Sequence, residues 1–133
     1  MLEGLRVVEM ATYIAAPAAG GIMADWGAEV IKIEAPGGDP IRQFFAGTRA
    51  EDIGNPVFDL DNRGKRSLMI DIKTEEGATA LRKLVGTADI FITNVRPSAL
   101  ERAGLDFDSL HKDFPGLIFA SVTGYGLEGP ERD

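Results

Sequence analysis

The sequence contains no cysteine, and His111 is its one histidine. Without cysteine, the protein can form neither a disulfide nor a thiolate metal site. A lone imidazole also excludes a metal centre built from several histidines. No apolar run approaches the roughly 20 residues that a membrane-spanning helix needs. We therefore expect no metal site and no membrane partner.

Acidic residues outnumber basic ones, 21 to 14, which gives a formal net charge of −7. Such a surface repels a polyanion, so we do not expect nucleic acid as a partner. Hydrophobic residues make up 44% of the chain and charged residues 26%, which fits one globular domain over residues 1–133. Residues 1–6 lack the basic and apolar regions of a secretory signal. We expect a cytoplasmic protein.

Two glycine-rich motifs that bind nucleotide phosphates are also missing. The chain has no Gly-x-x-x-x-Gly-Lys-Ser/Thr segment, which does not support a P-loop. The turn after the first apolar segment carries alanines and Pro17 where a dinucleotide-binding fold has Gly-x-Gly-x-x-Gly. Glu34 does follow about 20 residues later, where that fold places its ribose-binding acid. An NAD-dependent enzyme is therefore an alternative that rests on Glu34 alone.

Short apolar segments alternate with segments of helical pattern. Strands are predicted at residues 5–10, 29–34, 67–72, 89–93 and 117–122. Helices are predicted at residues 15–26, 74–85, 98–103 and 108–113, with Thr74 as an N-cap. Strands separated by helices predict an α/β fold with an open, mostly parallel sheet.

Two segments show neither pattern. Residues 35–64 are rich in Pro, Gly, Asp and Asn, and an irregular stretch of this length favours a functional loop. Residues 126–133 are also loop-like, although a helix normally covers the sheet after such a strand. We therefore expect a fold that is truncated after the fifth strand, either as a fragment or as one part that a companion chain completes.

A local concentration of positive charge precedes the third predicted strand. Arg63, Lys65 and Arg66 surround one glycine in an otherwise acidic chain. One interpretation is that they meet a small phosphorylated ligand. The other is a solvated turn whose cations offset nearby acidic residues, namely Asp59, Asp61 and Asp71.

Further cations follow the predicted strands. In open α/β sheets, ligands bind outside the carboxyl ends of the strands. Lys73, Arg96 and Arg102 could share this edge, and arginine forks suit phosphate oxygens. Alternatively, the two arginines balance neighbouring surface acids, namely Asp89, Glu101 and Asp106.

Taken together, these segments resemble the N-terminal part of the class III CoA-transferases of the CaiB/BaiF type, a family that includes the α-methylacyl-CoA racemases. The resemblance covers nearly the whole chain, in order. Its main segments are Leu5-Arg6-Val7-Val8-Glu9, Gly27-Ala28-Glu29-Val30-Ile31-Lys32-Ile33-Glu34, Gly38-Asp39-Pro40, Asn62-Arg63-Gly64-Lys65-Arg66-Ser67, Asp71-Ile72-Lys73, Asn94-Val95-Arg96-Pro97, Arg102-Ala103-Gly104 and Ser121-Val122-Thr123-Gly124-Tyr125-Gly126.

The resemblance implies a Rossmann-like domain that binds the nucleotide end of coenzyme A, within longer proteins that form interlocked homodimers. Coenzyme A or acyl-CoA is then a substrate, with a carboxylic acid as the second partner, and no cofactor is bound permanently. By resemblance, the residues that line the CoA site are Ile14, Ala15, Ile70, Asp71, Ile72, Lys73, Asn94, Val95, Arg96 and Arg102.

The resemblance also implies a reaction, in which an aspartate attacks the thioester and an aspartyl-CoA thioester forms before CoA passes to a second acid. That aspartate would lie beyond Asp133, as would the His and Asp of the racemases, so we assign no catalytic residue and expect this chain alone to be inactive. We expect the CoA-binding part of a family III acyl-CoA transferase. The alternatives are an α-methylacyl-CoA racemase and a non-catalytic CoA- or nucleotide-binding module.

One position departs from part of the family. Members that act on formyl-CoA and oxalyl-CoA carry glutamine where this chain has Ile14. An apolar side chain there suits a larger or less polar acyl group.

Overall fold

The computed structural model describes residues 1–46 and 54–131. Its centre is one five-stranded sheet in the order β3-β2-β1-β4-β5. Every pairing is parallel, and this strand order is that of Rossmann-type folds. The α/β prediction is confirmed. The strands are β1 (Arg6–Met10), β2 (Glu29–Glu34), β3 (Arg66–Met69), β4 (Ile90–Thr93) and β5 (Ile118–Ser121).

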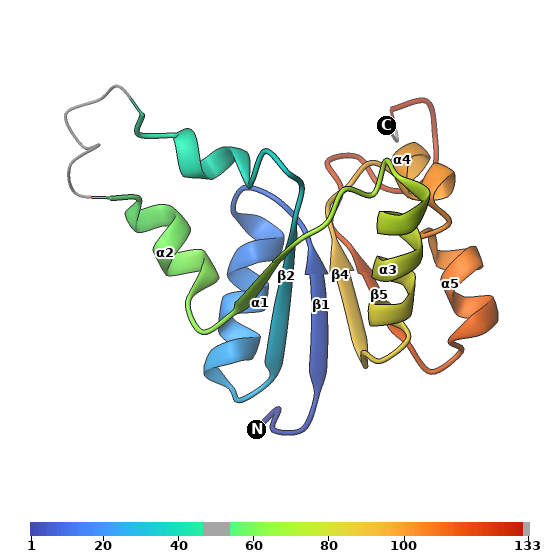
Figure 1. Cartoon of the computed structure of the whole chain (residues 1–133), viewed down its shortest axis with the longest axis horizontal. Helices are drawn as coiled ribbons and strands as arrows, with labels where there is room; N and C mark the ends of the chain where they lie inside the picture. Colours follow the sequence, from blue (N-terminus) through green and yellow to red (C-terminus); the bar gives the residue numbers. More distant parts are fainter. Residues whose placement is uncertain (47–53, 132–133) are drawn as a thin grey trace.

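Helices cover both faces of this sheet (Figure 1). On one side lie α1 (Ala15–Asp25) and α2 (Pro56–Asn62). On the other side lie α3 (Glu75–Val85), α4 (Pro97–Ala103) and α5 (Phe107–Asp113). Since the strands are all parallel, the loops that follow them meet at one edge of the sheet, at the top of Figure 1.

The core has two layers because strand side chains alternate between the faces. Val8 and Phe91 belong to the larger cluster, which lies under α3, α4 and α5 and includes Leu81 and Leu110. The smaller cluster lies under α1 and contains mainly small residues, namely Val7, Ala11, Ala16, Ala28, Val30 and Ile92. Small side chains bring α1 close to the strands.

The prediction of an irregular segment at residues 35–64 is wrong in part. A 3-10 helix, η1 (Pro40–Gln43), and helix α2 lie within it, and residues 47–53 are outside the described part. Asp39 caps η1 by accepting from Ile41 N, and Asn55 caps α2 by accepting from Phe58 N. Asp-Pro and Asn-Pro are the cap-plus-proline signals of helix starts, so the sequence did contain this information.

The third strand is also shorter than predicted, because β3 ends at Met69 rather than at residue 72. The following residues form the loop that leads into α3. Thr74 caps this helix by accepting from Gly77 N at 3.0 Å, as the sequence predicts. A Cβ on Gly77 would lie 2.0 Å from the carbonyl oxygen of Asp71, so only glycine allows the loop to pass this close to α3.

Within the two described ranges, no helix combines the length and the apolar character needed to cross a membrane.

Candidate functional site

The predicted site residues come from four loops or helix ends at the carboxyl edge of the sheet. Ile14 and Ala15 follow β1, and residues 70–73 follow β3. Residues 94–96 follow β4, and Arg102 lies in the last turn of α4. Segments that are far apart in the sequence therefore meet at one edge of the sheet (Figure 1).

A cleft of about 810 Å³ lies between α3, α4 and α5 and brings together two of the predicted cations, Lys73 and Arg102. Ile72 lines the same cleft, as do Arg82 and Lys112. Arg82 is held by this chain, since it donates to the carbonyl oxygen of Ser109 at 2.7 Å and to Asp113 Oδ2 at 2.7 Å. Lys73 and Arg102 are exposed side chains, accessible to a ligand in the cleft.

Arg96 lies apart from this pair. It lines a neighbouring cavity of about 430 Å³ together with Asn94, Val95, Thr123 and Tyr125. The sequence analysis expected that Lys73, Arg96 and Arg102 could share one edge. The structure separates Arg96 from the other two, since its cavity and their cleft have no lining residue in common.

Three other predicted residues take part in the fold itself. Asp71 Oδ1 accepts from the backbone N–H of Lys73 at 3.0 Å and so shapes the loop before α3. The Ile70 side chain packs against the larger core cluster. The Asn94 side chain accepts from Thr12 N at 3.0 Å and donates to Thr12 O at 2.8 Å, so this amide fixes the loop after β1.

That loop carries two half-exposed apolar side chains. Tyr13 is 54% exposed and Ile14 is 53% exposed, while Ala11 before them is buried. Tyr13 has φ 65, a left-handed conformation that is rare for an aromatic residue. Its N–H donates to Asp39 Oδ1 at 3.1 Å.

The three cations around the start of β3 all pair with carboxylates of this chain. Arg63 donates to both carboxylate oxygens of Asp25, and Arg66 donates to Glu29 Oε1 at 2.7 Å. Lys65 Nζ lies 2.6 Å from Glu9 Oε2. The structure thus assigns these cations to internal ion pairs. Neither interpretation of the sequence named these partners.

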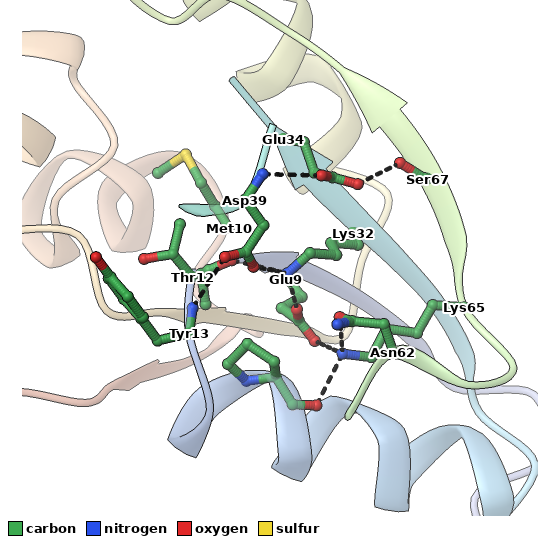
Figure 2. A network of polar contacts seen from close by, with 12 residues as sticks. Glu9, Met10, Thr12, Tyr13, Lys32, Glu34, Asp39, Asn62, Lys65 and Ser67 are labelled. Carbon is green, nitrogen blue, oxygen red and sulfur yellow. Dashed lines mark hydrogen bonds and ion pairs between the residues drawn. The ribbon is translucent and has the colours of Figure 1, made fainter. Parts of the chain in front are cut away.

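Lys65 belongs to a buried polar network that the sequence analysis missed (Figure 2). Glu9 accepts from Lys65 through one oxygen and from Lys32 through the other, at 2.6 and 3.1 Å. The side chains of Glu9 and Lys32 are 0% and 1% exposed. The signal was available, since both are charged residues inside otherwise apolar strands, and the sheet register places them side by side.

Burial governs the ionisation of this network. Removal from water raises the pKa of Glu9, although both lysines act to lower it. Burial likewise lowers the pKa of Lys65, although Glu9 acts to raise it. The ion pairs therefore only partly offset the desolvation of their members.

Glu34, on which the NAD alternative rests, is occupied by donors of this chain. Arg42 donates to its two oxygens, at 2.7 Å each. Ser67 Oγ donates to Oε1 at 2.9 Å, and Asp39 N donates to Oε2 at 3.0 Å. The hydrogen bonds from Arg42 are the main cause that lowers the pKa of Glu34 to about 2. Both carboxylate oxygens already accept hydrogen bonds within the chain, so Glu34 is not a free acceptor for ribose hydroxyls.

In the described part of the chain, no three His, Asp or Glu side chains come together in a way that could hold a metal ion.

Comparison with known proteins agrees with this architecture. CoA-transferase family III matches residues 2–133. The chain belongs to this family.

Family III members similar to this chain include two clostridial transferases. The chain is 48% identical over 136 residues to (R)-2-hydroxy-4-methylpentanoate CoA-transferase of Clostridioides difficile, across 100% of this chain and 34% of that protein. It is 44% identical over 136 residues to cinnamoyl-CoA:phenyllactate CoA-transferase of Clostridium sporogenes, across 100% of this chain and 33% of that protein. These names do not favour the racemase alternative.

A solved structure of the family has the same fold. The CAIB/BAIF family protein from Brucella suis superposes with a TM-score of 0.87 at 42% identity, across 98% of this chain and 35% of that one. This family III chain thus spans about a third of the length of the relatives that it matches, and it corresponds to their N-terminal portion.

Proposed function

We propose that residues 1–133 are the CoA-binding part of an acyl-CoA transferase that moves CoA between two carboxylic acids. The observation that supports this most is the cleft between α3, α4 and α5, where Lys73 and Arg102 come together in a chain of this family. Coenzyme A carries a diphosphate and a 3′-phosphate. Ammonium and guanidinium groups at the carboxyl edge of a parallel sheet suit these groups.

The two cavities would contact different parts of coenzyme A. Lys73 and Arg102 would hold one phosphate group in the larger cleft. Arg96 would contact the ligand from the neighbouring cavity, beside the loop that follows β4. Asn94 would act indirectly, because its amide is already used to fix Thr12.

The transfer itself would use an aspartate that we do not assign within residues 1–133. Its carboxylate attacks the thioester carbonyl, which breaks the carbon–sulfur bond and gives a mixed anhydride and CoA thiolate. The thiolate then attacks the aspartyl carbonyl, which releases the first acid as a carboxylate and leaves an aspartyl-CoA thioester. Repetition of these steps in reverse with the acceptor acid gives the new acyl-CoA.

The acyl group that we propose is apolar. Tyr13 and Ile14 are half exposed on the loop after β1, where apolar groups suit a branched or aromatic acyl chain rather than a formyl or oxalyl group. The two clostridial relatives are named for acids of this kind, 2-hydroxy-4-methylpentanoate and phenyllactate. We further propose a cytoplasmic enzyme that works as a homodimer or with a companion chain.

Isothermal titration calorimetry on the full natural protein tests the binding function. We expect CoA to bind more tightly than dephospho-CoA, because Lys73 and Arg102 in the larger cleft would recognise the extra phosphate. NAD should not compete with CoA, because Glu34 is already occupied. Binding of NAD in preference to CoA would refute the proposal and support an NAD-dependent enzyme instead.

Turnover assays on the same protein test the transfer. Isocaproyl-CoA or cinnamoyl-CoA with an unrelated apolar acid should yield the second acyl-CoA, whereas oxalate should be a poor acceptor. CoA binding without any exchange among these substrates would favour the non-catalytic module.

A further inference from the structure

Asp39 makes more contacts than the N-cap of a short 3-10 helix needs. Its Oδ1 accepts from Ile41 N at 3.1 Å, which is the capping bond. The same oxygen accepts from Tyr13 N at 3.1 Å, across 26 positions of the chain. Its Oδ2 lies 2.9 Å from Lys32 Nζ, and the side chain of Asp39 is 0% exposed. The carboxylate therefore links η1, β2 and the loop after β1 (Figure 2).

Lys32 completes the connection to that loop. Its ammonium donates to the carbonyl oxygen of Ala11 at 2.9 Å, besides its contacts to Glu9 and Asp39. Lys32 thus donates two hydrogen bonds, to Glu9 Oε1 and Ala11 O, and forms an ion pair with Asp39 Oδ2. With Lys65, the buried set contains two carboxylates and two ammonium groups, so its formal charges cancel.

The backbone of residues 11–13 is accordingly held from two sides. Lys32 Nζ donates to Ala11 O, and Asp39 Oδ1 accepts from Tyr13 N. The Asn94 side chain bonds both the backbone N–H and the backbone carbonyl of Thr12. Tyr13 adopts φ 65 within this frame. An unfavourable conformation of this kind persists only where the surroundings impose it, and such positions are concentrated at ligand sites.

We propose that Asp39 is a positioning residue that fixes the loop of residues 11–14 for the acyl end of the substrate. This inference rests on the function proposed above, in which Tyr13 and Ile14 face the acyl group. The alternative is a purely structural role, in which Asp39 only caps η1 and supports the fold as a whole.

The variant Asp39→Ser separates these roles. Serine caps a helix about as well as aspartate, but it is too short to reach both Tyr13 N and Lys32. Asp39→Asn keeps an acceptor for Tyr13 N and removes the negative charge next to Lys32. This variant replaces Asp39→Ser as the test if the serine variant does not fold. Asp106→Ser is the matched control, because Asp106 caps α5 by accepting from Ser109 N at 3.0 Å.

Two readouts on the full protein are needed, the Kd for a CoA thioester and the amide hydrogen exchange of peptides that cover residues 11–16 and 75–85. We expect Asp39→Ser to raise the Kd for a CoA thioester about tenfold and to speed exchange at residues 12–14. Exchange in α3 should stay as it is in the native protein. Asp39→Asn should have the same effects to a smaller extent, and Asp106→Ser should leave both readouts unchanged.

Unchanged exchange at residues 12–14 in Asp39→Ser would overturn the inference, as would equally faster exchange in both peptides. If the native protein binds no CoA but Asp39→Ser still loosens this loop alone, the proposed function fails and the positioning of the loop by Asp39 stands. The two failures are therefore distinguishable.

Discussion

Arg102 and Arg66 are both exposed arginines, yet they have different surroundings. Arg102 lines the cleft between α3, α4 and α5. Arg66 lies on the edge strand β3 and pairs with Glu29 of β2. We expect Arg102→Ala to weaken CoA binding by about 1.5–3 kcal/mol, because a charge-assisted hydrogen bond to a phosphate is lost. Titration calorimetry measures this, with Arg66→Ala as the matched control that leaves the Kd unchanged.

Arg96→Ala tests the separation of the cavity around Arg96 from the larger cleft. Because Arg96 lies in the neighbouring cavity, its loss should weaken CoA binding but preserve the preference for CoA over dephospho-CoA, which we attribute to the larger cleft. If Arg96→Ala abolishes that preference and Arg102→Ala preserves it, the 3′-phosphate has been placed in the wrong cavity.

Glu34 predicts an acid-sensitive contribution to stability. Its pKa is lowered from 4.5 to about 2, mainly by Arg42, and its side chain is 8% exposed. A lowered pKa means that the unfolded state binds the proton first, so this contribution is present above about pH 4.5 and is lost as the pH falls towards about 2. The shift corresponds to about 3 kcal/mol at most.

Urea unfolding of the native protein and of Glu34→Gln at several pH values checks this. The free energy of unfolding should differ most between the two proteins near neutral pH, and the difference should shrink below about pH 4. Glu9, whose raised pKa has the opposite sign, is common to both proteins and cancels. A difference that is independent of pH would contradict the assignment.

At the scale of the elements, the start of α3 connects the fold to the site. Gly77 lies so close to Asp71 that an added Cβ would fall 2.0 Å from a backbone oxygen. Gly77→Ala should therefore displace the loop that carries Lys73, lower the free energy of unfolding by about 1–3 kcal/mol and weaken CoA binding. Thermal unfolding and calorimetry measure both effects.

The matched control at this scale is Gly37→Ala, where an added Cβ has no neighbour within 4 Å. It should leave stability and CoA binding almost unchanged. If Gly77→Ala destabilises the protein but binds CoA with the native Kd, then the loop of residues 70–73 does not contribute to the site.

At the scale of the whole molecule, large apolar side chains remain exposed on and around β5. Ile118 on the edge strand β5 is 60% exposed, and Phe107 and Leu127 are 49% and 50% exposed. Several exposed apolar side chains in one region are typical of a surface that another polypeptide covers. Native mass spectrometry of the protein as isolated should show more than one chain in the assembly. A stable monomer that does not bind a hydrophobic dye would contradict this expectation.

The fold could be predicted from the sequence in most of its elements. Apolar periodicity is a local property of the sequence, so all five strands were predicted. The start of α3 was predicted from Thr74 as its N-cap. Helix α2 was missed although Asn55-Pro56 signals its start, because its short length gives little periodicity. Membership of the CoA-transferase family followed from many short segments in the right order, which no single motif would have shown.

What only the tertiary structure decided is which charged residues are available to a ligand. Arg63, Lys65 and Arg66 are the densest cations in the sequence, and all three pair with carboxylates more than 30 positions away. Lys73, Arg96 and Arg102 were all candidates in the sequence, and only the packing of α3, α4 and α5 brings Lys73 and Arg102 to one cleft and leaves Arg96 in another cavity. Ion pairing depends on distances of a few ångströms between distant segments, and strand register and helix packing set those distances. The sequence by itself determined most of the elements, and the fold determined which charged side chains are left exposed at the candidate site.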